Sequence, residues 1–232
     1  MVLERLNPGA PRQLLDDSSR KLAFILCLPL IDGVFATLLV TGTVNTFSQM
    51  LNIAITIFTG AGALAVLYSE ASNRKEAVQM VNNVIPVLLA GVIAVALIAP
   101  IFEQLFRTEL LKYAAGLAIS SIALQLADIE IAERIPPTAV ILTGLLLSYQ
   151  GPVNLVLTLE YVLPALGTAL IAITGLYLAT GLKKYGMNLQ YIRYGGSAVL
   201  GIIAMSLFGL NVPENIGPFV FMVSVLVSLR KS

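Results

Sequence analysis

The chain has 232 residues, of which 57% are hydrophobic and only 12% are charged, and its formal net charge is +1. A soluble domain usually carries about a quarter of charged residues, so this composition indicates an all-α integral membrane protein. The near-zero net charge argues against nucleic acid as a partner, because there is no basic surplus to neutralise phosphates. Without histidine the chain cannot build a His-ligated zinc or haem site or a serine–histidine dyad. We therefore expect no metal, no cofactor and no catalytic residues.

Residues 1–21 carry mixed charges and precede the first apolar run, which predicts a cytoplasmic segment and not a signal peptide. Residues 22–229 then form one transmembrane domain, and residues 230–232 form a cytoplasmic tail. Within the domain we predict about eight transmembrane segments, at residues 22–43, 50–68, 81–101, 110–127, 135–149, 153–180, 195–210 and 217–229. The fifth and eighth are short or half-spanning, since roughly 20 residues cross a bilayer, and seven segments is the alternative.

Positively charged residues support this division of the chain, because Lys and Arg are retained in cytoplasmic loops. With both termini inside, only Arg107 and Lys112 of the 14 Lys and Arg residues fall outside. A weak internal repeat, of residues 22–127 with 135–229, is a further hypothesis. It rests on the likeness between PLIDGVFATLLVT, which begins at Pro29, and PPTAVILTGLLLS, which begins at Pro136.

Two acidic residues lie within the apolar runs. Asp32 follows Lys21 by eleven residues, which places it ~16 Å above the inner boundary if the segment is helical. Glu160 lies on a predicted descending segment at ~18 Å above the same boundary. A carboxylate at this depth costs at least ~2.5 kcal/mol on insertion scales and usually marks an ion or proton pathway. The alternative is that both acids are protonated or hydrogen-bonded and serve packing alone.

Helix breaks accompany both acids. Pro29 and Gly33 flank Asp32, and Pro164 would free the carbonyl of Glu160, because an interior proline removes the hydrogen bond to the carbonyl four residues earlier. Broken helices with an acid at mid-depth are a recurrent way for transporters to bind a cation or relay a proton. Other polar residues that we expect to line a path or form its inner mouth are Thr37, Thr56, Thr59, Asn82, Gln125, Asp128, Glu130 and Glu133.

Two stretches carry a resemblance to a known group of proteins. At LPLIDGVFATLLVTG and at ELLKYAAGLAISSIALQLADIEIAERIPPTAVILTGLLLS, the chain resembles an archaeal family of multi-pass membrane proteins of unassigned function. The resemblance implies an archaeal cell membrane and assigns no catalytic residue. The acidic inner loop and the short helices also look, more loosely, like the small exporters that include lysine and manganese exporters, although their paired acidic motifs are absent.

The leading hypothesis from the sequence is a small multi-pass transporter or ion-conducting protein of the cell membrane, with Asp32 and Glu160 as the cation or proton site. Its expected partners are the lipid bilayer and a small ion or solute, and a homo-oligomer is an option. A structural or accessory subunit is the alternative, and it predicts an unbroken interior without a central cavity. An intramembrane enzyme that uses the two acids as a pair is a third hypothesis.

Overall fold

The computed structural model of the chain describes residues 15–151, 158–183, 188–213 and 216–230. Within those ranges the chain is helical and holds no strand longer than an isolated bridge between Phe106 and Tyr149. Its elements are α1 (Asp17–Ile31), α2 (Val34–Val40), α3 (Phe47–Ile53), the π-helix η1 (Ala54–Phe58), α4 (Ala61–Glu70), α5 (Arg74–Leu105), α6 (Thr108–Leu126), α7 (Glu130–Glu133), α8 (Pro137–Ser148), α9 (Val162–Leu182), α10 (Leu189–Leu207) and α11 (Ile216–Arg230).

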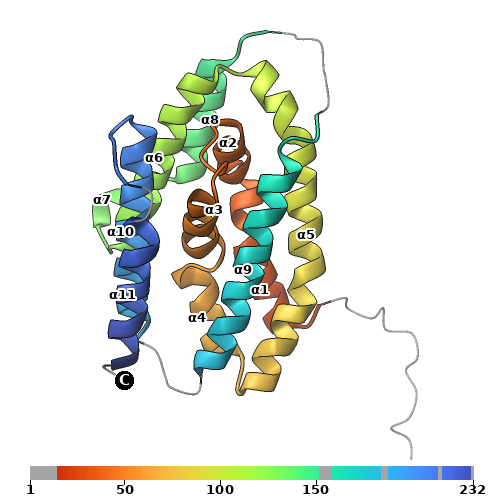
Figure 1. The fold of residues 1–232 in the computed structure, drawn as a ribbon, viewed down its shortest axis with the longest axis vertical. Coiled ribbons are helices and arrows are strands. Elements are labelled where there is room, and N and C mark those ends of the chain that lie inside the picture. The colour runs from red at the N-terminus through yellow and green to blue at the C-terminus, as the bar shows by residue number, and fades with distance from the viewer. Residues whose placement is uncertain (1–14, 152–157, 184–187, 214–215, 231–232) are drawn as a thin grey trace, which may run out of the picture.

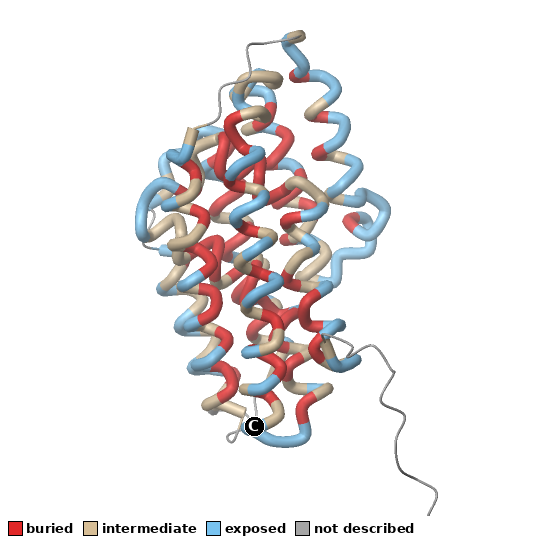
Figure 2. Tube along the Cα trace, turned by 90° about the vertical axis from the view of Figure 1, so that its right-hand side faces the viewer, coloured by how far each residue is buried: buried red, intermediate tan, exposed pale blue. Residues whose placement is uncertain are grey.

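The first helices of the chain form the interior of the bundle (Figure 1). Helices α5 and α9 pack together on one side of α1 to α4, and α5 also contacts α1 and α2. On the other side α10 packs between α6 and α11, while α8 packs against α6. Buried residues follow the inward faces of these helices, as Figure 2 shows. Helix α2 is buried along its whole length and η1 in part, whereas only Asn52 and Ile53 are buried in α3.

Several helices have the length and composition of membrane spans. Helix α5, with 32 residues, and helix α9, with 21 residues, each pass this test alone. The pair α1 and α2, bent by 45°, and the pair formed by α3–η1 with α4, bent by 48°, raise the number to four if each pair is one span. Helices α8 and α11 are also apolar but shorter.

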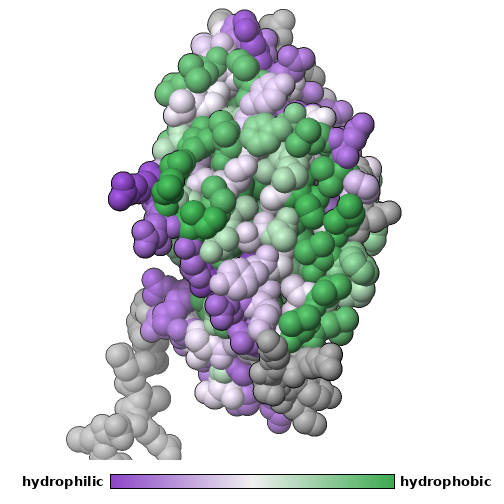
Figure 3. All heavy atoms as spheres, turned by 90° about the vertical axis from the view of Figure 1, so that its left-hand side faces the viewer, coloured by the Kyte–Doolittle hydropathy of each residue, from purple (hydrophilic) through white to green (hydrophobic). Residues whose placement is uncertain are grey.

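Large apolar side chains also cover the outside of the bundle. They include Leu146 of α8, Leu163 and Leu178 of α9, and Phe219 and Leu226 of α11, all of which are more than half exposed. Figure 3 shows hydrophobic residues over much of the face on the side of α10 and α11. Soluble monomers rarely expose apolar patches of this extent, and such surfaces mark contact with a membrane or another protein.

Each of the eight predicted segments coincides with a helix or with a bent pair, but two of them differ from expectation. The second segment is broken between η1 and α4, which the sequence analysis did not anticipate. The sixth was expected to be helical from residue 153, whereas α9 begins at Val162 and residues 159–161 form a bend and turn. Crossing of the membrane by all eight segments, the cytoplasmic termini and the internal repeat stay predictions, and most of the N-terminal segment and the tail lies outside the described residues.

Candidate functional site

Asp32 occupies the break between α1 and α2. Its backbone N–H donates to the Leu28 carbonyl at 3.0 Å and closes the last turn of α1. Its carboxylate Oδ1 accepts the N–H of Val34 at 3.0 Å and so satisfies the first free donor of α2. Between them Gly33 has φ of 81°, a left-handed conformation that glycine adopts without steric cost. One half-buried carboxylate therefore joins the end of one helix to the start of the next.

Pro29 lies one turn before this break. Helix α1 continues past it to Ile31, so Pro29 does not itself end the helix. Its missing N–H nevertheless leaves the Ile25 carbonyl without its usual donor. Both Pro29 and Ile25 line the same cavity as Asp32. The predicted break thus falls at Gly33, with Pro29 loosening the turn before it.

A second break follows η1, in which the chain widens into a π-helix. The N–H and Oγ1 of Thr59 both donate to the Ala54 carbonyl, at 2.8 and 2.6 Å. A Cβ atom on Gly60 would lie 2.1 Å from the Thr56 carbonyl oxygen, so only glycine fits at this position. The N–H of Leu64 then bonds to the Gly60 carbonyl and starts α4. The helical hydrogen-bond pattern is therefore interrupted between the end of η1 and the start of α4.

The two breaks are held together by an aromatic pair. Phe35 of α2 and Phe58 of η1 are each within a few residues of a break and are fully buried. Their ring centroids lie 5.1 Å apart with an edge-to-face angle of 79°, which is a favoured arrangement of two aromatic rings. The packing fixes the position of one break relative to the other.

Both breaks open into one cavity of about 280 Å³. Asp32 and Pro29 lie on one wall, Thr56 and Gly60 to Ala63 on a second, and Gln125, Pro137 and Thr138 on a third. Asp32 is the one titratable side chain among these lining residues. Because an uncompensated charge in an apolar surrounding is costly, a cavity with a single carboxylate favours a proton or a cation as its occupant.

Gln125 closes the cavity on the side of α6. Its Nε2 donates to the Ala132 carbonyl at 2.9 Å and to the Ile135 carbonyl at 3.3 Å. Ser121, one turn earlier, donates to the same Ile135 carbonyl at 2.5 Å. These bonds hold the chain between α7 and α8 against α6, so the start of α8 stays at the cavity wall.

The structure places the other predicted path residues in several different environments. Thr37 is buried and donates to the Gly33 carbonyl at 2.8 Å, and it does not line the Asp32 cavity. Thr59 lines a separate apolar groove. Asn82 accepts a hydrogen bond from Tyr177 at the exposed surface. Of the expected path, Thr56 and Gln125 alone join Asp32 in the cavity.

The predicted acidic mouth does not form a single cluster. Asp128, whose φ of 59° closes the turn after α6, pairs with Arg193 of α10. Glu130 and Glu133 are exposed on the short helix α7. The charge of Asp128 is therefore compensated, and it ties α6 to the first turns of α10.

Glu160 and Pro164 require a correction. Glu160 is exposed in the turn before α9 and is not part of the Asp32 cavity. Pro164 falls in the first turn of α9, where the N–H groups have no helical acceptor and a proline costs no bond. It marks the start of a helix and not a break. The predicted depth of Glu160 assumed a helix from residue 153, whereas Glu160 itself lies in a turn and α9 begins at Val162.

Gly60 and Thr138 are site residues that the sequence analysis did not single out for this role. The run Thr59-Gly60-Ala61-Gly62, inside an otherwise apolar segment, is the signal that could have indicated a break. Glycine pairs are also common in ordinary helix contacts of membrane proteins, so the pattern alone does not separate the two roles.

Comparison with known proteins places the chain in a family without an assigned function. No curated protein and no solved structure matches it. A model of a family of unknown function, DUF5794, matches residues 88–208, which include the cavity residues Gln125 and Thr138 and begin after both helix breaks. The expected archaeal origin and exporter likeness stay expectations. Since the match covers more than half of its length, the chain belongs to DUF5794.

Proposed function

We propose that this protein is a small multi-pass transporter or ion-conducting protein of the cell membrane that carries a proton or a small cation, with Asp32 as the binding group. The observation that supports it most is that two separate helix breaks open into one cavity with a single titratable residue. Transporters commonly bind ions where unwound helix segments meet near mid-membrane. Asp32 and the break at Gly60 take the place of the acid pair expected from the sequence.

The membrane placement rests on three features. Helices α5 and α9 are long and apolar enough to span, and the two bent pairs become so when each is counted as one span. Large aliphatic side chains point outward from α8, α9 and α11. Basic residues fall almost entirely on the side assigned to the cytoplasm. With both termini inside, the break at Asp32 lies in the middle third of the first spanning segment.

The charge of the cavity favours a monovalent ion. One carboxylate balances one positive charge, whereas a divalent ion would leave an uncompensated charge in an apolar surrounding. The Asp32 carboxylate supplies oxygen ligands, which hard cations prefer, and Thr56 and Gln125 in the same lining also carry side-chain oxygens. A proton needs only the carboxylate, so both occupants are compatible with the cavity.

The two competing hypotheses have less support. An accessory subunit predicts an unbroken interior without a central cavity, and the cavity that the two breaks share does not favour it. An acid-pair enzyme needs two carboxylates within hydrogen-bond reach. Among the described residues the cavity offers Asp32 alone.

The test is ion flux in liposomes that contain the purified protein. Asp32→Asn removes the charge while the side-chain oxygen can still accept the Val34 N–H, so folding should be kept. We expect proton or Na⁺ flux to fall to the level of empty liposomes in this variant. Glu160→Gln is the matched control, because it neutralises an exposed acid outside the cavity, and its flux should equal that of the wild type. Undiminished flux in a folded Asp32→Asn variant would contradict the assignment.

A further inference from the structure

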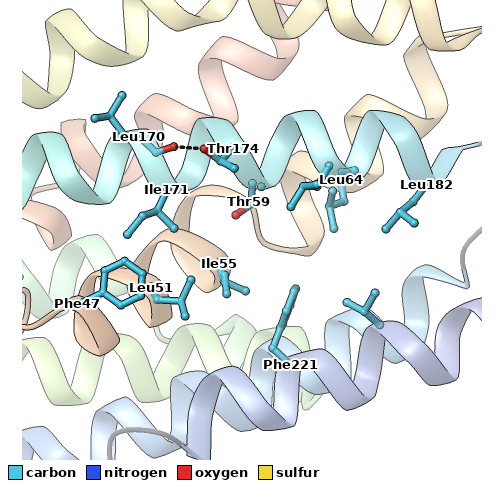
Figure 4. A pocket seen from close by; sticks show the side chains of 14 residues that line it. Phe47, Leu51, Ile55, Thr59, Leu64, Leu170, Ile171, Thr174, Leu182 and Phe221 are labelled. Carbon is cyan, nitrogen blue, oxygen red and sulfur yellow. Dashed lines mark hydrogen bonds between the residues drawn. The ribbon is translucent and has the colours of Figure 1, made fainter.

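An apolar groove lies beside the Asp32 cavity, between α9 and α11 (Figure 4). Its volume is about 490 Å³. Ile171 and Leu182 of α9 and Phe221 of α11 point into it, and η1 forms its floor through Ile55. Phe47 at one end is 70% exposed, so the groove has an open rim.

The groove presents hydrocarbon alone. Thr59 and Thr174 are the two lining residues with polar side-chain atoms. Thr59 donates its hydroxyl to the Ala54 carbonyl at 2.6 Å, and Thr174 donates its hydroxyl to the Leu170 carbonyl at 2.8 Å. Both hydroxyl protons are thus used within their own helices. An occupant finds no free donor there and must itself be apolar over the length of the groove.

The dimensions of the groove select a thin occupant. Its α9 wall runs from Leu170 to Leu182, which is ~18 Å at the helical rise and close to the ~15 Å thickness of one hydrocarbon leaflet. A volume of 490 Å³ over this length gives a mean cross-section of roughly 27 Å². An α-helix about 10 Å wide needs roughly 80 Å², whereas an alkyl chain with neighbours at about 4 Å needs roughly 20 Å². The groove can therefore enclose one hydrocarbon chain, and it is too narrow to enclose a helix of a second copy.

The groove also shares a wall with the Asp32 cavity. Ile55 and Thr59 face the groove, while Thr56 and Gly60 face the cavity. The π-helical turn η1 is therefore the partition between the two spaces. A chain that fills the groove supports this partition from the apolar side, since packing against it adds dispersion contacts that an empty groove lacks.

We propose that the groove between α9 and α11 binds one hydrocarbon chain of an inner-leaflet membrane lipid and thereby supports the η1 wall of the Asp32 cavity. This inference rests on the membrane placement of the proposed function and not on the ion that is carried. The inner leaflet follows from the predicted orientation with both termini inside, because the groove runs along α9 toward Leu182, at the end of the bundle where α4 also ends and α5 begins.

The chain has no tryptophan, so a single introduced one is a unique fluorescent reporter. Phe221→Trp places it in the groove, and Phe219→Trp places it on the exposed face of the same helix. Each variant is reconstituted in vesicles of phosphatidylglycerol with brominated chains, then extracted into bromine-free detergent and purified. We expect tryptophan at position 221 to keep several-fold more bromine quenching than tryptophan at position 219. Equal residual quenching at the two positions would overturn the proposal.

A second pair of variants tests the site itself. Thr174→Phe fills the groove and should abolish the residual quenching of tryptophan at position 221. Leu163→Phe adds the same ring to an exposed position of α9 outside the groove and should leave the quenching unchanged. A tryptophan at position 221 that is unquenched even in the vesicles, in a particle of twice the mass, would instead assign the groove to a second copy and refute a lipid. Quenching as expected without ion flux would refute the transport proposal alone.

Discussion

The break at Gly60 can be tested by adding a single methyl group. A Cβ atom at this position would lie 2.1 Å from the Thr56 carbonyl oxygen, about 1 Å inside normal contact distance. The obstacle is backbone, which cannot rotate away as a side chain could, so η1 must shift. Overpacking of this kind costs about 1 to 3 kcal/mol. We therefore expect Gly60→Ala to destabilise the fold by at least that amount.

Gly62 supplies the matched control two residues later. Its Cβ would lie 3.5 Å from Ile25 Cγ2, an ordinary contact, and alanine is favoured over glycine in a helix by up to about 1 kcal/mol. Gly62→Ala should be neutral or stabilising. The two variants should then differ by about 1 to 4 kcal/mol, or roughly 2 to 16 °C in Tm for a chain of this size.

The measurement is thermal unfolding of both variants in the same detergent, followed by far-UV circular dichroism. Ion flux in liposomes provides a second readout, because a displaced η1 changes the wall of the Asp32 cavity. A Gly60→Ala variant that melts at or above the temperature of Gly62→Ala would refute the geometry of the break.

Further predictions concern other parts of the fold. Gly33→Ala should lower the free energy of unfolding by about 1 to 2 kcal/mol, because alanine is strained at a φ of 81°. Gly201→Ala is the control and should cause no such loss, because a Cβ atom there would meet open space. Chemical denaturation of the two variants measures the difference. Lys21 near the start of α1 donates a hydrogen bond of 2.7 Å to Glu70 at the end of α4, and both residues lie outside the predicted spans. This hydrogen bond is the main cause that holds the pKa of Glu70 below its usual value. The stabilisation by Glu70 is therefore complete above its unfolded pKa and lost as the pH falls through the lower folded value. The Tm of Glu70→Gln should therefore fall less steeply than that of the wild type as the pH is lowered. A Tm-against-pH profile identical to that of the wild type would contradict this. Lys183→Met should cost about 1 kcal/mol in thermal unfolding, because the Lys183 ammonium caps carbonyls at the end of α4, and no loss of stability would count against that cap.

Local sequence was sufficient to predict the first break. Gly33 directly after Asp32, with Pro29 one turn earlier, combines a residue that tolerates left-handed backbone with one that removes a helical donor. Both effects act within four residues and need no partner. The break falls where this reasoning placed it, and Asp32 caps the helix that follows.

The position of Glu160 could not be predicted in the same way. Its depth was calculated from an assumed helix start, and rise per residue gives a depth only where the chain is helical. Pro164 is equally compatible with a kink inside a helix and with the first turn of a new one. The second interpretation is correct, and it moves Glu160 out of the bundle interior.

Composition and periodicity by themselves determined that this chain is helical and where its apolar segments lie, because both depend on transfer from water. Pro29 and Gly33 determined that Asp32 sits at a break, because their effect depends on neighbouring residues alone. Tertiary structure alone decided that the η1 break faces Asp32, that Gln125 and Thr138 complete its cavity, and that Glu160 stays outside it. The physical reason is that residues distant in the chain meet only through packing. Contacts such as that of Phe35 with Phe58 fix which helix faces meet, and no local propensity encodes that choice.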